Sequence, residues 1–290
     1  MDNTTKYIGH NLNISNGFVT VADYAKSLDS NFMQIFLSTP QKYGNKRRDI
    51  VELKTLDAKL KEYNMKIVIH ASYKLNFCNP ENSFIHKMAI ADLVNNLEDS
   101  VILNAIGVVV HMGKNVIKLN LTDDDAINNY VKGIRSTLSK TNINSTIILE
   151  TGAGVGSEVC TSIFGLSKLY NKFSNEEKKR IKFCIDTCHI YSYGYNIGDV
   201  DFVDVFCNLI QDYLGWYNIA CIHLNDSKDK VGKCLDHHAD LGKGKIKLDG
   251  LKKFVKICVN KNIPIVLETP CDTLTKKEQI SLVKSWANEI

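Results

Sequence analysis

The chain has 290 residues, of which 44% are hydrophobic and 23% are charged, and its formal net charge is +4 at pH 7. This length could hold two ordinary domains, but α/β barrels routinely reach it as a single domain. The mildly basic charge is compatible with a polyanionic partner and does not require one. The nine cysteines are scattered singly except for Cys184 and Cys188, a spacing typical of neither a disulfide framework nor a CxxC zinc site, so reduced thiols are expected.

The sequence shows no sign of a membrane or secretory segment. No apolar run approaches the roughly 20 residues that a helix needs to cross a bilayer. The N-terminus, MDNTTKYIGHNL, lacks the basic-then-apolar pattern of a signal peptide. We therefore expect a protein of a reducing intracellular compartment, the cytoplasm or nucleus, without membrane contact, and a monomer by default.

Eight short apolar runs recur along the chain with charged segments between them. In chain order they span residues 7–12, 32–37, 66–72, 107–113, 145–151, 181–189, 219–226 and 264–270. Continuous apolar character is typical of strands buried on both faces, as in a parallel sheet. The spacing of about 35 residues fits a strand, a crossover helix and two loops.

Two of the connectors have a clear helical pattern. Residues 48–64 and 122–141 place apolar side chains at three- and four-residue steps, and the second segment opens with a Thr122 cap and an acidic first turn. No linker interrupts the series, so we predict one (β/α)8 TIM barrel domain over residues 1–290. A doubly wound open sheet is the alternative fold, but the GxGxxG that it would carry after the first strand is absent.

The last six runs end in side chains that bind metals. Parallel barrel strands bring their C-terminal ends to one rim, where barrel enzymes keep their active sites, so these residues should be neighbours. A carboxylate buried at a strand end costs several kcal/mol unless it is paired or metal-bound. With the D-x-H pair of the loop after the seventh run, the predicted ligands are His70, His111, Glu150, Asp186, His189, His223, Asp236, His238 and Glu268.

Five histidines and four carboxylates form a nitrogen-rich set that suits Zn²⁺, with Mn²⁺ or Fe²⁺ as substitutes, and fits Mg²⁺ or Ca²⁺ poorly. Catalytic zinc usually takes three protein ligands and a water, so nine ligands could serve two or three ions if one carboxylate bridges. The other histidines are left out of the set. We expect His86 on a solvated polar helix face, whereas His10 and His237 should lie near the rim.

These residues resemble the endonuclease IV family of apurinic/apyrimidinic (AP) endonucleases, which belongs to the xylose-isomerase-like TIM barrel superfamily. The resemblance spans nearly the whole chain and rests on HASY at 70, HMG at 111, ETGAGVG at 150, DTCH at 186, HLNDSK at 223, DHHADLGKG at 236 and ETP at 268. It implies three zinc ions. The first would be held by His70, His111 and Glu150, the second by Glu150 as a bridge with Asp186, His223 and Glu268, and the third by His189, Asp236 and His238.

The activity that the resemblance implies is hydrolysis of the phosphodiester 5′ to an abasic site in duplex DNA during base excision repair. The products would be a 3′-hydroxyl and a 5′-deoxyribose phosphate. We expect Glu150 to be the catalytic carboxylate, next to a metal-bound hydroxide. Zinc suits the task, because it lowers the pKa of bound water from 15.7 to about 7, whereas a lone side-chain base supplies only about 10²- to 10⁴-fold.

The resemblance also indicates where DNA would bind. Tyr73 occupies the place where the family inserts an aromatic side chain at the lesion, and stacking on a base contributes about 1–3 kcal/mol. The loop 38–48 offers phosphate contacts through Lys42, Tyr43, Lys46, Arg47 and Arg48, and the seventh run is followed by Asn225, Ser227 and Lys228. The chain departs from the family's motifs at Gln41, Lys74 and His237, which concern DNA contact and not the nine ligands.

Two other functions remain open from the sequence. A metal-dependent sugar-phosphate isomerase or epimerase of the xylose-isomerase-like class would use the same rim. Such enzymes generally hold one or two ions mainly through carboxylates, so His189 with the D-x-H pair distinguishes the two readings. A catalytically silent DNA-binding barrel is the second alternative, and it would need no intact ligand set.

Overall fold

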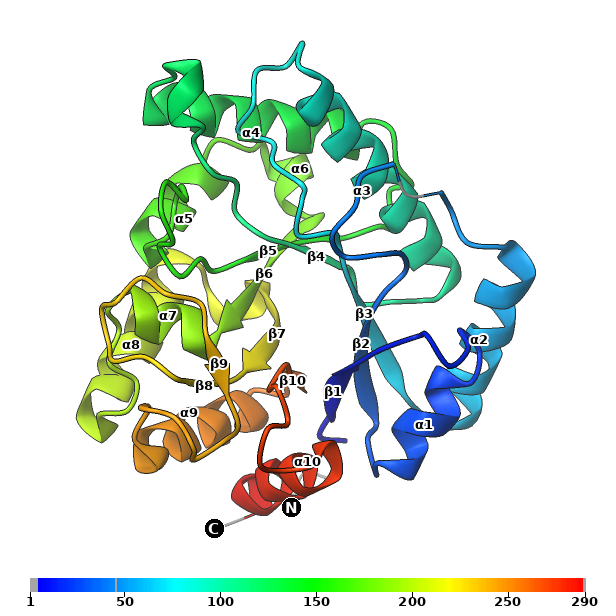
Figure 1. Ribbon diagram of the computed structural model, residues 1–290, viewed down its shortest axis with the longest axis vertical. Helices are drawn as coiled ribbons and strands as arrows, with labels where there is room; N and C mark the ends of the chain where they lie inside the picture. The colour runs from blue at the N-terminus through cyan, green and yellow to red at the C-terminus, as the bar shows by residue number, and fades with distance from the viewer. Residues whose placement is uncertain (1–4, 45, 289–290) are drawn as a thin grey trace.

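The structure is a computed structural model that describes residues 5–44 and 46–288. Eight parallel strands close into a barrel in the order β1-β10-β7-β6-β5-β4-β3-β2 (Figure 1). They are β1 (Ile8–Leu12), β2 (Phe32–Phe36), β3 (Lys66–His70), β4 (Val108–Val110), β5 (Ile147–Glu150), β6 (Ile181–Asp186), β7 (Ile219–Leu224) and β10 (Ile265–Leu267). Each strand lies inside one of the eight apolar runs, so the predicted (β/α)8 barrel is confirmed.

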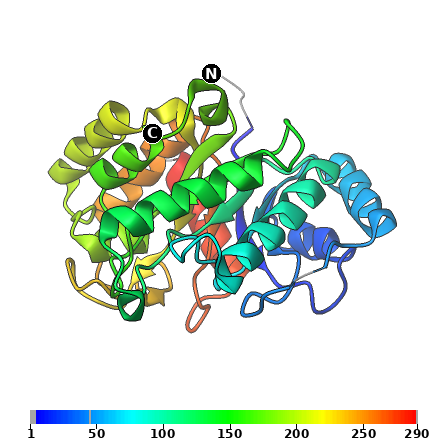
Figure 2. The ribbon, with the colours of Figure 1, turned by 90° about the horizontal axis from the view of Figure 1, so that it is seen from above.

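Helices surround the strands, and Figure 2 shows the long helices α3 and α4 along the outside of the barrel. The α-helices are α1 (Val21–Ser27), α2 (Ile50–Glu62), α3 (Phe84–Ile102), α4 (Asp123–Leu138), α5 (Ile163–Tyr170), α6 (Asn175–Lys178), α7 (Thr187–Tyr193), α8 (Val200–Tyr213), α9 (Leu248–Asn260) and α10 (Lys276–Asn288). Short 3₁₀ helices cover Ile117–Leu119 and Trp216–Asn218, and β8 (Asp226–Ser227) pairs antiparallel with β9 (His238–Ala239) at the rim. Among the described residues, no helix is both long and apolar enough to span a bilayer.

The two helices predicted from periodicity are present, and the second begins at the expected Thr122 cap. Asp49 caps α2 by accepting from the main-chain N–H groups of Val51 and Glu52. Thr122 and Asp125 form a reciprocal capping box at the start of α4, whose first turn is acidic. Such caps satisfy N–H groups that a helix leaves unpaired at its N-terminus.

An apolar ring fills the barrel directly beneath the rim. Seven buried side chains from seven strands form it: Phe32, Val68, Val109, Ile148, Cys184, Cys221 and Val266. Side chains in a strand alternate with a period of two, so the residues two positions further on point into the same lumen. Those residues are Gln34, His70, His111, Glu150, Asp186, His223 and Glu268. The two-residue period of the strands therefore places six of the predicted ligands and one glutamine directly above this apolar ring.

The expectation of a solvated His86 is wrong. His86 is 2% exposed, and its Nδ1 lies 3.0 Å from the Phe77 carbonyl oxygen and 2.9 Å from that of Asn79. The loop before α3 folds back over this part of the helix, and α4 approaches closely at Gly133, where an added Cβ would lie 3.1 Å from His86 Cε1. His86 is thus a hydrogen-bonded core residue.

The close contact between β1 and β2, where the barrel closes, leads to a prediction about the free energy of unfolding. A Cβ added at Gly9 would lie 1.4 Å from the Phe32 carbonyl oxygen and 2.3 Å from Ser30 Oγ. Because that oxygen belongs to the neighbouring strand, it cannot move without disturbing the β1–β2 pairing. We expect Gly9→Ala to lower the free energy of unfolding by about 3 kcal/mol, measured by chemical denaturation.

Gly165→Ala in α5 is the matched control for this prediction. An added Cβ there meets Ser162 Oγ at 3.1 Å and Cys160 Cα at 3.3 Å, contacts that a shift of a few tenths of an ångström relieves. Alanine favours a helix over glycine by about 1 kcal/mol, which offsets the cost of that shift. Its stability should stay close to that of the wild type. A Gly9→Ala protein as stable as the wild type would contradict the described strand contact.

Candidate metal centre

Glu150, at the end of β5, is the centre of the polar cluster and is 1% exposed. Its Oε2 lies 3.2 Å from His70 Nε2 and 3.1 Å from His111 Nε2. Its Oε1 lies 2.8 Å from His223 Nδ1 and 3.5 Å from His189 Nδ1. Four histidines from different parts of the rim therefore surround one buried carboxylate, and its two oxygens face different partners.

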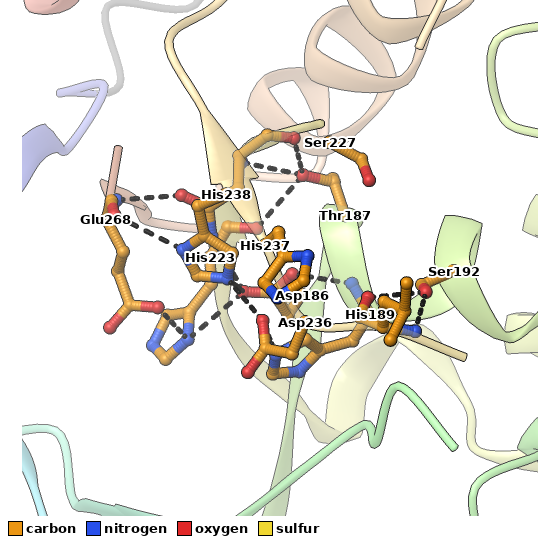
Figure 3. Close-up of polar contacts among 12 residues, drawn as sticks. Asp186, Thr187, His189, Ser192, His223, Ser227, Asp236, His237, His238 and Glu268 are labelled. Carbon is orange, nitrogen blue, oxygen red and sulfur yellow. Dashed lines mark hydrogen bonds and ion pairs between the residues drawn. The ribbon is translucent and has the colours of Figure 1, made fainter. Parts of the chain in front are cut away.

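His223, in β7, is fully buried, and its Nδ1 faces three carboxylates, of which Figure 3 shows those of Asp186 and Glu268. Besides Glu150, this nitrogen lies 3.1 Å from Glu268 Oε2 and 3.8 Å from Asp186 Oδ2. Asp186 ends β6, and Glu268 follows β10 directly. A single nitrogen thus stands among the carboxylates of three strands.

Asp236, in the loop before β9, is the centre of a third group (Figure 3). Its Oδ1 lies 3.1 Å from His189 Nε2 and 3.0 Å from His238 Nε2. His189 belongs to the first turn of α7, where its main-chain N–H donates to Asp186 Oδ1 at 2.9 Å. Asp186 therefore caps the helix that presents His189.

The structure brings the nine predicted ligands into one continuous cluster. His70, His111 and Glu150 place one donor atom each within 4.8 Å of one another, as the predicted first group would. The same is true of Asp186 with His189 and His238, and of Glu268 with His70 and His223. Neighbouring groups share residues, because His70 belongs to two of them and both Asp186 and Glu268 lie near His223. Distances alone therefore do not assign Asp186 and Glu268 to particular ions.

The donor set fits divalent cations better than internal pairing. In the part of the chain that the structure describes, no lysine or arginine forms an ion pair with the carboxylates of Glu150, Asp186, Asp236 or Glu268. His238 Nε2 is buried and lies close to Asp236, yet it makes no hydrogen bond of acceptable geometry. Buried polar atoms are nearly always satisfied, and buried charges are paired or coordinate metals. A buried nitrogen without a hydrogen bond, facing carboxylates, is therefore what a ligand site requires.

The histidines of the cluster differ in the direction in which their surroundings shift the pKa. Burial lowers the pKa of His111 to about 4, against the attraction of Glu150. Burial also disfavours the charge on His238, but Asp236 and Asp186 outweigh it and raise its pKa to about 9. Burial likewise opposes ionisation of Glu268, and the facing His223 outweighs it and lowers its pKa to about 2. Without a metal, His238 is therefore protonated at neutral pH while His111 is not.

Main-chain carbonyls orient three of the histidines. His70 Nδ1 lies 2.7 Å from the Ala71 carbonyl, His189 Nδ1 lies 2.8 Å from that of Thr151, and His238 Nδ1 lies 3.2 Å from that of Glu268. Because a carbonyl can only accept, each Nδ1 carries the hydrogen and each Nε2 is left for a metal.

Several residues that support the cluster were not identified as such from the sequence. Asn225, predicted as a DNA contact, is instead fully buried: its Nδ2 donates to Asp186 Oδ2 at 2.7 Å, and its Oδ1 accepts from the Glu268 main-chain N–H at 3.1 Å. Ser227 is also fully buried, and Lys228 pairs with Asp272 at 3.1 Å. Gln34 contacts both His223 and Glu268. Its only sequence signal is a polar residue inside an apolar run.

Two further carboxylates hold the rim loops and are not ligands. Asp226 accepts from the main-chain N–H groups of Gly242, Gly244 and Ile246 at 2.9–3.0 Å. Asp240 accepts from the main-chain N–H groups that follow Glu268, those of Cys271, Thr273 and Leu274. Both sides of the loop that carries Asp236 and His238 are thereby fixed.

A cavity of about 500 Å³ opens above the cluster, and four of the predicted DNA-contact residues line it: Gln41, Tyr43, Tyr73 and Lys74. Tyr73 is 43% exposed, and its ring stands edge-on to those of His70 and His111, with centroids 5.2 and 5.3 Å away. The other two predicted residues do not line the cavity. Lys42 is exposed on the same loop as Gln41, and His237 pairs with Asp229 at 2.8 Å.

The arginines of the loop 38–48 have structural partners. Arg47 Nε pairs with the buried Asp99 of α3 at 2.7 Å, and Arg48 Nε donates to the Leu37 carbonyl at 2.6 Å. The main-chain N–H of Arg48 also donates to Asp99. These contacts attach the loop to the barrel, which differs from the phosphate contacts expected from the sequence.

Cys188 is fully buried beside the third group and could place its sulfur within 4.8 Å of donor atoms of Asp236 and His238. Burial and the nearby Asp186 raise the pKa of its thiol well above the ordinary value. Metals bind the thiolate and not the thiol, so this environment disfavours Cys188 as a ligand.

Known proteins show clear similarity to the chain. Residues 22–289 match the family described as xylose isomerase-like TIM barrel. The "Putative endonuclease 4" of Acanthamoeba polyphaga mimivirus is 39% identical over 296 residues, which cover 99% of this chain and 95% of that protein. The "Apurinic-apyrimidinic endonuclease 1" of Plasmodium falciparum is 30% identical over 279 residues, which cover 94% of this chain and 45% of that protein.

Solved structures agree with these similarities. Endonuclease IV from Thermus thermophilus superposes with a TM-score of 0.83 at 25% identity, covering 99% of this chain and 100% of that one. A D-tagatose 3-epimerase-like protein superposes with a TM-score of 0.69 at 15% identity, covering 97% and 96%. At that identity the epimerase-like protein shares the fold alone.

Metal binding to the stripped protein should release protons. His238, with its pKa near 9, must lose a proton to become a ligand, whereas His111, with its pKa near 4, has none to lose at neutral pH. Calorimetry with Zn²⁺ at about pH 7.5 should therefore give a binding heat that changes with the ionisation heat of the buffer. His238→Ala should release fewer protons, and His237→Ala should match the wild type. A heat independent of the buffer would contradict the raised pKa.

Cys188→Ser should keep the full complement of bound metal. The thiol is protonated where it lies, so replacing sulfur with oxygen removes no ligand. Elemental analysis of the purified variant should match the wild type, and His238→Ala should lose metal in the same assay. If Cys188→Ser lost an ion, the thiol and not Asp236 or His238 would be the ligand.

Proposed function

The chain belongs to the endonuclease 4 family within the xylose isomerase-like TIM barrels, and we propose on that premise that it is a zinc-dependent AP endonuclease. It would hydrolyse the phosphodiester 5′ to an abasic site in duplex DNA and leave a 3′-hydroxyl and a 5′-deoxyribose phosphate. The observation that carries the proposal is the cluster of five histidines and four carboxylates around Glu150, above an apolar barrel floor.

We assign three ions to the cluster, and the geometry around the carboxylates supports this number. The two oxygens of Glu150 face His70 and His111 on one side and His223 on the other, as a bridging carboxylate would. His223 with Asp186 and Glu268 completes the second set, and Asp236 between His189 and His238 forms the third. The imidazole-rich donors favour Zn²⁺, with Mn²⁺ or Fe²⁺ as substitutes.

When bound, zinc supplies Lewis acidity that activates water and stabilises the attacking and departing oxygens of a phosphate displacement. The chain's own contribution starts with Glu150. Burial opposes its ionisation, but the surrounding histidines, His111 and His223 above all, outweigh burial and hold its pKa well below the ordinary value. Glu150 is therefore a carboxylate at neutral pH, and its two oxygens would hold two adjacent ions beside the attacking water. The phosphorus–O3′ bond breaks as the new phosphorus–oxygen bond forms. The proton that the attacking water loses passes to solvent, and solvent returns a proton to the leaving 3′ oxygen.

The cavity above the cluster supports a DNA substrate. Tyr73 stands at its wall with nearly half of its surface exposed, directly beside two ligand histidines. In this role Tyr73 stacks in the gap that the missing base leaves, while Gln41, Tyr43 and Lys74 contact the flanking nucleotides. Lys42 and His237, outside the cavity, would contact backbone phosphates at the rim. The proposal treats the protein as a monomer.

Neither alternative function is carried by a specific observation. A sugar-phosphate isomerase or epimerase has support only from the shared fold. A catalytically silent DNA-binding barrel leaves the convergence of nine ligand side chains without a purpose. The proposal of an active endonuclease accounts for both the cluster and the cavity.

Strand cleavage tests the proposal directly. A duplex with one abasic site should be nicked 5′ to that site by the zinc-loaded protein and left intact after chelation. Glu150→Gln and His111→Ala should each lose at least about 10²-fold in rate, because the first removes the charge of the bridging ligand and the second removes a ligand, and both should keep part of the DNA affinity.

Two controls define the outcome of the cleavage assay. Tyr217→Ala should nick at a rate close to that of the wild type, since Tyr217 is 89% exposed and lies just before β7, at the opposite end of that strand from the cluster. A duplex without the abasic site should stay intact. Unchanged cleavage in both Glu150→Gln and His111→Ala would remove the cluster from the mechanism, and an intact abasic duplex with zinc bound would remove the proposed activity.

A further inference from the structure

Gln34 is an uncharged polar residue among the ligands. It is the third residue of β2, is fully buried, and lies two positions after the ring residue Phe32. Its Nε2 donates to Glu268 Oε1 at 2.5 Å, and its Oε1 lies 2.8 Å from His223 Nε2. The carboxylate of Glu268 can only accept, so the amide nitrogen must face Glu268 and the amide oxygen must face His223.

This orientation determines which nitrogen of His223 can bind a metal. The amide oxygen of Gln34 accepts a hydrogen bond, so His223 Nε2 keeps its hydrogen, and Nδ1 is the nitrogen that exchanges its hydrogen for a metal. Nδ1 is the atom that lies 2.8 Å from Glu150 Oε1 and 3.1 Å from Glu268 Oε2. His223 thus directs Nδ1 toward the carboxylates of the cluster. His70, His189 and His238 do the opposite: each hydrogen-bonds a main-chain carbonyl through Nδ1 and faces a carboxylate of the cluster with Nε2.

A side chain is needed here because of where His223 lies. It stands inside β7, which pairs with β6 on one side and β10 on the other. Main-chain carbonyls of a sheet point toward the neighbouring strands and not into the lumen, so a side chain from another strand has to supply the acceptor for Nε2–H. An aliphatic side chain would leave that N–H unsatisfied, and a carboxylate would place a second negative charge against Glu268. A neutral amide meets both requirements.

We propose that Gln34 is a positioning residue that makes His223 an Nδ1 ligand and turns Glu268 so that Oε2 faces the same ion. The inference rests on the metal centre of the proposed function and deepens it. Gln34 does not touch the metal or the DNA. It acts through two ligands of the second ion, and partners of this kind typically contribute about 10- to 100-fold in metal affinity.

The test compares two buried amide side chains by zinc affinity. Gln34→Leu removes both hydrogen bonds, and Gln34→Met does so with a side chain of more similar shape, in case the leucine variant fails to fold. Asn96→Leu is the control, because Asn96 is a buried amide of the outer helix α3 and donates to the Asp92 carbonyl at 2.7 Å, away from the cluster. Competition with a chelator should show one Zn²⁺ bound about 10- to 100-fold more weakly in the Gln34 variants and unchanged in Asn96→Leu.

A spectroscopic readout separates positioning from general destabilisation. In NMR of the zinc-loaded, ¹⁵N-histidine-labelled protein, one ring should be zinc-bound through Nδ1 with a hydrogen on Nε2, and this signature should disappear in Gln34→Met. Wild-type protein in which every zinc-bound ring uses Nε2 would overturn the inference. Wild-type zinc affinity in the Gln34 variants, or an equal loss in Asn96→Leu, would overturn it as well.

The same preparations distinguish this inference from the proposed function. Incision of an abasic duplex is measured separately on the zinc-loaded wild type. If zinc binds with the Nδ1 signature and the duplex stays intact, the endonuclease proposal fails and the role of Gln34 stands. A wild-type protein that binds no zinc would overturn the role of Gln34.

Discussion

Buried negative charge at one end of the barrel is the constraint on which the rest of the structure depends. Glu150, Asp186 and Glu268 stand on an apolar ring, and in the described part of the chain no lysine or arginine pairs with them. Desolvating such groups costs several kcal/mol each unless cations or hydrogen bonds offset it. Five histidines only partly meet this need, because His111 resists protonation. Metal ions complete the balance, which is why the histidines are held with lone pairs directed inward.

The supporting residues serve that same geometry. Main-chain carbonyls orient His70, His189 and His238, and the amide of Gln34 orients His223. Asn225 links the carboxylate of Asp186 to the main-chain N–H of Glu268. Asp226 and Asp240 then fix the loops on either side. The ligands are therefore preorganised, and the cavity above them, walled by Tyr73, is left for substrate.

The sequence predicts the barrel and the convergence of the nine candidate ligands well, because both follow from the positions of the apolar runs. Apolar runs at regular spacing predict strands, and a ligand-type residue closing each run identifies the rim. Partners that come from distant strands are not encoded in this way. The sequence around His86 does not indicate that the loop containing Phe77 covers this residue. It also does not show that Arg47 pairs with the buried Asp99. Asn225 is predicted as a rim contact because its hydrogen bond to Asp186 follows only from the fold. The contacts of Gln34 could not be predicted for the same reason, since its partners His223 and Glu268 lie 189 and 234 residues away in the sequence.

The central claim is that the cluster is a three-ion metal centre, and anomalous diffraction from crystals grown with zinc tests it most directly. Difference maps from data collected on either side of the zinc absorption edge should show three peaks. One should lie among His70, His111 and Glu150, one beside His223 Nδ1, and one among His189, Asp236 and His238. The absence of anomalous peaks, with the histidines hydrogen-bonded directly to the carboxylates, would contradict the account.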